Sequence, residues 1–252
     1  MITERKKISN EKIRELAEKA SKSLLTGDYT NSIGLLKPLL NAKIAFSKLD
    51  LLGREIGEAC CRKPEALLTA CDQIVASETM GSFVVASRAL TCLLDKDLET
   101  VMERTREYIV KGNKWYVCDI IGERSLGQAL VDHFDRTLPW LARFLTDENK
   151  WVKRSTGVAI HYFSKRVVNE AQKTQKLLEL LEPHIEEKQL DVIKGIGWGL
   201  KTIGKHHPDL LVPFLEKQLK AKKKISKLMI KKALTYLGKD RRSRLERHVQ
   251  GL

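Results

Sequence analysis

Apolar side chains recur at intervals of three and four residues along nearly the whole chain, a spacing that places them on one face of an α-helix. Clear examples lie at Ile13–Ala20, Leu177–Leu181 and Leu210–Leu215. The alternation of apolar and polar residues that is typical of β-strands is nearly absent. The pattern therefore predicts an all-α protein of roughly a dozen helices.

Short polar breaks separate the predicted helices. Asn113 and Asn149 are of a residue type favoured just before the first turn of a helix, and Pro64 and Pro208 suit the first turn itself. None of these breaks is long enough to be an interdomain linker. We therefore expect a single domain over residues 1–252.

The second half of the chain repeats itself. The tripeptide Asn-Lys-Trp at 113–115 recurs at 149–151, and residues 152–165 resemble residues 192–205, with a weaker echo over 225–239. A repeat of 36 to 40 residues that holds two helices predicts an α-solenoid of HEAT-like helical pairs. Because such an array curves, we expect a concave groove along its inner helices.

The positive charge of the chain indicates a class of binding partner. The chain has a formal net charge of +14, and an excess of cations favours a polyanionic partner such as DNA. The excess is concentrated near the end, in the basic helices expected over 217–252. The groove is therefore predicted to be basic and to hold a phosphate backbone, with a merely solvated run as the ordinary alternative. Only Asp240 and Glu246 oppose the basic residues of the segment, which are Lys217, Lys220, Lys222, Lys223, Lys224, Lys227, Lys231, Lys232, Lys239, Arg241, Arg242, Arg244 and Arg247.

Several other classes of protein are disfavoured. No stretch approaches the roughly 18 apolar residues that a membrane helix needs, and the charged N-terminus is not that of a signal peptide. The 5 cysteines lie within helical patterns and lack metal-ligand spacing, so we expect reduced, mostly buried thiols and no metal. These features predict a cytoplasmic protein, associated with the nucleoid if the source is prokaryotic.

One tryptophan lies off the apolar stripe of its predicted helix. In the segment 190–205, Trp198 shares its face with Lys194, Lys201 and Lys205. A large hydrophobic side chain among lysines favours contact with a ligand, and the lysines suit DNA phosphates. The alternative is that Trp198 fills a gap between two repeats.

A second tryptophan has a carboxylate as its helical neighbour. Four-residue spacing stacks Trp115 beneath Asp119, and a carboxylate beside an aromatic wall can stabilise a developing positive charge or orient a water. A solvated or capping Asp119 is the ordinary alternative. One repeat further on, Arg154 suits a phosphate, unless it pairs with a surface acid such as Asp147, while Trp151 is expected in the core.

These residues occur in three short motifs: Lys-Trp-Tyr-Val-Cys-Asp at 114–119, Trp-Val-Lys-Arg-Ser at 151–155 and Ile-Gly-Trp-Gly-Leu at 196–200. In this order and spacing, the sequence resembles the AlkD-type DNA alkylation repair family of HEAT-like DNA glycosylases. The resemblance is clearest over residues 95–220 and looser toward both ends.

The resemblance implies a monofunctional glycosylase that hydrolyses the N-glycosidic bond of cationic N3- or N7-alkylated purines in duplex DNA, without flipping the base into a pocket. By similarity, Asp119 stabilises an oxocarbenium-like sugar and presents a water, and Trp115 and Trp198 flank the deoxyribose. Arg154 and Lys201 contact the DNA backbone. We expect a monomer that needs no cofactor.

Two alternatives stay open. A non-catalytic relative could bind unusual DNA structures, although an acid such as Asp119 facing a polyanion weakens binding and so favours catalysis. A HEAT scaffold for an acidic protein would show no preference for DNA. The sequence also departs from the family pattern, because a further groove aromatic of the N-terminal third has no matching context here, Tyr29 and Phe46 being the nearest candidates.

Overall fold

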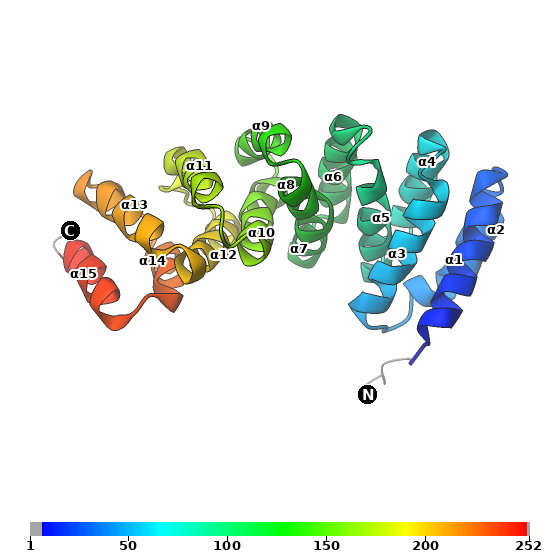
Figure 1. The fold of residues 1–252 in the computed structure, drawn as a ribbon, viewed down its shortest axis with the longest axis horizontal. Helices are drawn as coiled ribbons and strands as arrows, with labels where there is room; N and C mark the ends of the chain where they lie inside the picture. The colour runs from blue at the N-terminus through cyan, green and yellow to red at the C-terminus, as the bar shows by residue number, and fades with distance from the viewer. Residues whose placement is uncertain (1–6, 251–252) are drawn as a thin grey trace. The chain divides into compact units, whose positions relative to one another are not determined.

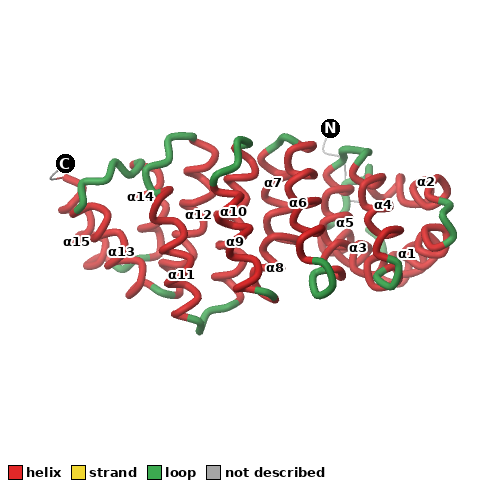
Figure 2. The backbone as a smooth tube through the Cα atoms, turned by 90° about the horizontal axis from the view of Figure 1, so that it is seen from above, coloured by secondary structure: helices red, strands yellow, loops and turns green. Residues whose placement is uncertain are grey.

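The computed structural model describes residues 7–250, with side chains for residues 7–245. Every regular element in that range is helical and no strand occurs in it (Figures 1 and 2). The predicted all-α class is therefore confirmed. The helices form two compact units, Met1–Ser125 and Leu126–Leu252.

Unit 1 is built from helical pairs stacked side by side. Helices α1, α3, α5 and α7 pack successively against one another in one row, and α2 packs on α4 in the second row. The elements of this unit are α1 (Asn10–Leu25), α2 (Tyr29–Leu40), α3 (Phe46–Cys60), α4 (Pro64–Val75), α5 (Met80–Leu90), η1 (Thr91–Leu93), α6 (Leu98–Gly112) and α7 (Trp115–Ile121), after which the π-helical turn η2 (Gly122–Leu126) begins.

Unit 2 has the same construction. One row contains α8, α10, α12 and α14, and in the other row α11, α13 and α15 pack in succession. Stacked pairs in both units confirm the predicted helical-repeat solenoid, whereas the basic concave groove stays a prediction. The elements are α8 (Gly127–Asp132), α9 (Phe134–Leu145), α10 (Lys150–Arg166), α11 (Ala171–Leu181), η3 (Glu182–His184), α12 (Leu190–His206), α13 (Pro208–Lys220), α14 (Lys227–Ala233), η4 (Leu234–Tyr236) and α15 (Lys239–Gln250).

The repeat predicted from the sequence corresponds to two adjacent helices. Both α10 and α12 have 17 residues, and they pack against each other. Their backbones meet at glycines: a Cβ on Gly157 would lie 2.1 Å from the carbonyl carbon of Gly195, and a Cβ on Gly199 would lie 3.0 Å from the Gly157 oxygen. No side chain fits at this contact, so the two helices approach more closely than side-chain packing would allow.

The predicted helix boundaries hold, with one correction. The Asn149 side chain accepts hydrogen bonds from the backbone of the first turn of α10, and Pro64 and Pro208 stand at the first positions of α4 and α13. Asn113 was predicted as an N-cap, and this is wrong. It ends α6 in the left-handed conformation (φ 42°), which asparagine tolerates better than most residues, and Lys114 precedes α7.

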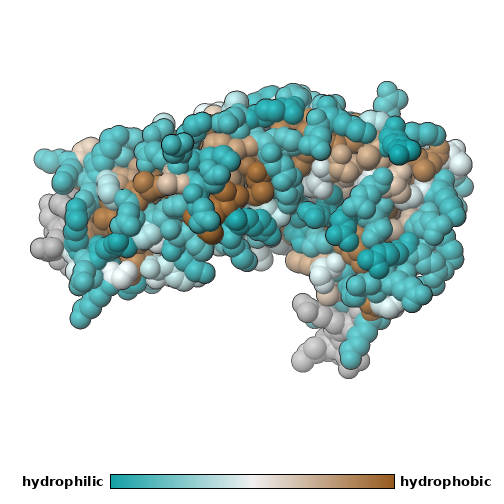
Figure 3. Space-filling view, viewed as in Figure 1, coloured by the Kyte–Doolittle hydropathy of each residue, from teal (hydrophilic) through white to brown (hydrophobic). Residues whose placement is uncertain are grey.

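The core lies between the two helical rows of each unit. Hydrophilic side chains cover most of the face seen in Figure 3, with hydrophobic residues in small groups between them. Cys60, Cys71 and Cys118 are buried and Cys61 and Cys92 are partly buried, close to the predicted burial, and none of the five forms a disulfide. Burial raises the pKa of the Cys92 thiol to about 12, so this thiol is protonated and unreactive near neutral pH.

Candidate functional site

Helix α7 carries Trp115 and Asp119 one turn apart. Trp115 is the first residue of the helix and is 58% exposed, and Asp119 is half-buried. Val117, Ile120 and Ile121, the predicted apolar stripe, are all buried. Trp115 therefore stands at the surface of unit 1, as expected from the sequence, with Asp119 at the edge of the buried face.

Close packing fixes the start of α7 within unit 1. A Cβ on Gly112, the last residue of α6, would lie 2.5 Å from a methyl group of Val117 and 2.9 Å from the ring of Phe83. Glycine therefore leaves room for these two side chains where α6 meets α7. The chain then turns at Asn113, and this tight connection sets the position of Trp115 at the start of α7.

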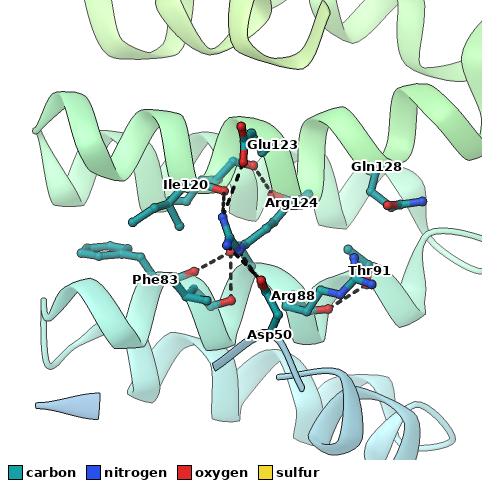
Figure 4. Close-up of polar contacts among 12 residues, drawn as sticks. Asp50, Phe83, Arg88, Thr91, Ile120, Glu123, Arg124 and Gln128 are labelled. Atoms are coloured by element: carbon teal, nitrogen blue, oxygen red, sulfur yellow. Dashed lines mark hydrogen bonds and ion pairs between the residues drawn. The ribbon is translucent and has the colours of Figure 1, made fainter. Parts of the chain in front are cut away.

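A buried guanidinium anchors the turn that follows α7. The Nε and Nη2 atoms of Arg124 donate to the two carboxylate oxygens of Asp50 on α3, at 2.6 and 3.1 Å (Figure 4). Its Nη1 donates to the carbonyl of Ile120 at 3.3 Å, and the ring of Phe46 lies 5.5 Å from the guanidinium carbon. Such bidentate, charge-assisted pairs have a defined geometry. This pair attaches the helix to α3 directly beyond Asp119.

In unit 2, Trp198 of α12 stacks on His161 of α10. The ring centroids are 4.2 Å apart and the planes differ by 24°. The hydroxyl of Thr202 donates to the Trp198 carbonyl at 3.2 Å and lies 2.6 Å from His161 Nδ1. Because a carbonyl only accepts, we assign the imidazole proton to Nδ1, which donates to the hydroxyl. One face of this half-buried indole is thus covered by the neighbouring repeat, as expected of a residue that fills a gap between repeats.

His161 is neutral near pH 7. Burial lowers its pKa to about 4, and the charges of Lys165, Arg166 and Lys201 act in the same direction. A neutral imidazole places no cation against the indole, which leaves the π-electrons of Trp198 available to an external positive charge. This partner was not predicted from the sequence. The signal for it was the 40-residue repeat, which aligns His161 with Lys201, close to Trp198 along α12.

Arg154 lies inside the contact between α10 and α12. It is 7% exposed, and its Nη1 donates to the carbonyl of Asp191 at 3.2 Å. A Cβ on Gly195 would lie 2.8 Å from Arg154 Cγ, so the glycine makes room for this side chain. The guanidinium thus extends toward α12, and its contact with a phosphate stays a prediction. Trp151 is buried, as predicted.

The predicted DNA-binding lysines lie along α12. The Nζ atoms of Lys201 and Lys205 are 5.0 and 5.6 Å from the ring centroid of Tyr236 in η4, a residue that the sequence analysis did not single out. Lys194 is half-buried, one turn before Trp198. None of the three lysines has an acidic partner among the side chains of residues 7–245.

The two candidates for an additional groove aromatic differ in position. Tyr29 begins α2, whereas Phe46 begins α3 and therefore belongs to the row that contains α7. Phe46 is partly exposed. Of the two, only Phe46 shares its helical row with Trp115.

The described side chains include no cluster of three or more His, Cys, Asp or Glu that could hold a metal ion. No helix within the described range combines the length and the apolar character that crossing a bilayer requires.

Comparison with known proteins identifies one family. The family model described as DNA alkylation repair enzyme matches residues 45–237, well over half of the chain. No curated protein and no solved structure matches the chain significantly. The matched range runs from α3 to η4 and so includes α7, α12 and Tyr236. The chain belongs to the DNA alkylation repair enzyme family, and DNA repair is its role.

Proposed function

We propose that this protein is a monofunctional DNA glycosylase that hydrolyses the N-glycosidic bond of purines made cationic by alkylation at N3 or N7, in duplex DNA. One observation carries the proposal. Trp115, 58% exposed, stands one helical turn from the half-buried carboxylate of Asp119, in a protein of net charge +14. An exposed indole beside an acid suits a ligand that develops positive charge.

The chemistry needs few groups because the alkylated base is already a good leaving group. As the bond between C1′ and the base nitrogen breaks, its electron pair leaves with the base, which becomes neutral, and the sugar becomes oxocarbenium-like. The Asp119 carboxylate stabilises this positive charge and accepts a proton from the water whose oxygen attacks C1′. The products are the free base and an abasic site.

The aromatic residues add to this stabilisation. The face of an indole attracts positive charge, and the contribution grows when the cation is withdrawn from water. We assign this role to Trp115 and to Trp198, whose indole is held by the neutral His161 and faces no protein cation on that side. Neither residue requires the base to leave the helical stack.

Binding to the DNA backbone is assigned to the basic residues of α10 and α12. Lys194, Lys201 and Lys205 have no acidic partner among the described side chains, so their charges are available to phosphates. Arg154 is buried against α12, and we assign it a contact between its guanidinium group and a DNA phosphate.

The decisive test compares wild type with Asp119→Asn on a duplex that contains one 7-methylguanine. We expect abasic-site formation to fall about 100-fold or more, the usual effect of removing one preorganised charge-stabilising group. Affinity for the duplex should stay equal or rise, because an acid facing phosphates is lost. Asp135→Asn is the matched control, since Asp135 is exposed and pairs only with Lys176 among the described residues.

Two results would contradict the proposal. Equal base release by wild type and Asp119→Asn would place the chemistry elsewhere. Absence of release by wild type, on 7-methylguanine and on bulkier cationic adducts alike, would favour a non-catalytic binder of DNA structure. The burial of Arg154 and the stacking of Trp198 are the observations that favour this second candidate, because both have a structural explanation.

A further inference from the structure

An exposed aromatic ring stands among lysines at the end of unit 2. Tyr236 is 51% exposed, and Lys201 Nζ and Lys205 Nζ lie 5.0 and 5.6 Å from its ring centroid. The two lysines are one turn apart on the same face of α12. About half of the surface of Tyr236 is exposed, so its ring is accessible to a ligand.

The backbone that carries this ring is held firmly. Arg242 Nη2 donates to the carbonyls of Leu234 and Thr235, at 3.2 and 3.4 Å. Leu234 and Leu237, on either side of Tyr236, are buried. The exposure of the tyrosine is therefore a property of a fixed segment, in which the neighbouring side chains point into the core and this ring does not.

The basic residues of this part of the chain divide into two groups. On the side of α13 they are neutralised: Arg241 pairs with Asp209 at 2.6 Å, and Arg244 pairs with the buried Glu216. On the side of α12, Lys201 and Lys205 are not: neither lysine pairs with an acid among the side chains of residues 7–245. Positive charge without internal compensation thus accumulates beside the exposed ring.

We propose that Tyr236, Lys201 and Lys205 form a binding site for an unpaired nucleotide of a DNA strand. The ring stacks on the base with its open face, and the two ammonium groups hold the adjoining phosphates. Base faces are covered by their neighbours inside a duplex, so only an unpaired base offers a face to an aromatic side chain. Stacking of this kind, beside a positively charged surface, is how proteins bind single strands without reading their sequence. The site serves binding and needs no step of base excision.

The test measures affinity for undamaged DNA by fluorescence anisotropy, at one fixed salt concentration. A labelled 12-nucleotide single strand is compared with a 30-base-pair duplex, for wild type, Tyr236→Ala and Tyr236→Phe. We expect Tyr236→Ala to bind the single strand about fivefold more weakly or worse, since stacking on one base contributes at least that much. Tyr236→Phe should match wild type, and affinity for the duplex should change less than about twofold.

Two controls distinguish stacking on Tyr236 from the effect of positive charge and from the loss of any exposed apolar side chain. Leu190→Ala removes another exposed apolar side chain of α12 and should leave both affinities unchanged. Lys201→Ala should weaken both ligands and reduce their salt dependence. Equal weakening of single strand and duplex by Tyr236→Ala, or no weakening of either, would overturn the proposal. Because the DNA is undamaged, loss of glycosylase activity would not affect this result.

Discussion

The two units each carry a tryptophan proposed to meet the damaged nucleotide, and the two side chains are supported in opposite ways. Trp115 of unit 1 stands on the surface, with its position set by the backbone of α7 and the turns on either side of it. Trp198 of unit 2 is half-buried and is held by another side chain, His161, at a centroid separation of 4.2 Å.

The two tryptophans therefore differ in how strongly their positions indicate a ligand. Trp115 is exposed, so a ligand can reach its ring without any rearrangement of unit 1. The position of Trp198 has a structural explanation already, so its functional role rests on chemistry alone. The evidence for a ligand is accordingly stronger at unit 1 than at unit 2.

The largest expected effect comes from releasing α7 from α3. In Asp50→Ala, the buried Arg124 guanidinium loses its bidentate carboxylate partner and keeps Glu123 at 4.0 Å, which we expect to cost about 3 kcal/mol of unfolding free energy. Denaturant unfolding monitors the loss, and base release should fall as well because Trp115 and Asp119 lose their anchor.

The control for this prediction is an ion pair at the surface. Asp135→Ala breaks the exposed pair with Lys176, for which about 1 kcal/mol or less is expected. If Asp50→Ala is no more destabilised than Asp135→Ala, the buried pair does not hold α7 in place.

An intermediate effect distinguishes the two tryptophans directly. Trp198→Ala should lower the free energy of unfolding by about 1–2 kcal/mol, because it removes a stacked, half-buried ring. Trp115→Ala should change it by less than about 0.5 kcal/mol, as expected for an exposed residue. Both changes should slow base release about tenfold. Equal losses of unfolding free energy would show that the two rings are supported alike, which would contradict the proposed difference between Trp115 and Trp198.

A pH-dependent effect concerns the protonation of His161. The folded protein lowers the pKa of this imidazole to about 4, from the usual 6.5, so the unfolded chain binds the proton more readily. Stability is therefore lost as the pH falls from 6.5 toward 4. His161→Phe, which can stack but not titrate, should lose less stability over the same interval in denaturant unfolding at a series of pH values. Identical pH profiles for the two proteins would refute this role of His161.

Local features of the fold could be predicted from the sequence, and long-range ones could not. Helical periodicity identified the helices and the α10–α12 repeat, because both depend on neighbouring residues. Asn113 was misassigned because asparagine suits either end of a helix, and its left-handed backbone, which identifies it as the end of α6, is not evident from the local pattern.

The same division applies to the candidate site. The stripe of α7 predicted correctly that Trp115 would be exposed. By contrast, the stacking of His161 on Trp198 and the pairing of Arg124 with Asp50 join residues far apart in the sequence, and no local pattern indicates them. The burial of Arg154 depends on how closely α12 approaches α10, which a single helix does not reveal.

The glycine contact between α10 and α12 has a mechanical consequence. With no side chain between Gly157 and Gly195, nothing at this point can change rotamer to absorb a displacement of one helix relative to the other. A displacement of α12 would therefore be passed to α10 through direct backbone contact, so we expect the two helices to move together. The imidazole and the indole on these two helices consequently keep their separation, and strain imposed by a distorted DNA strand would be relieved elsewhere in the chain.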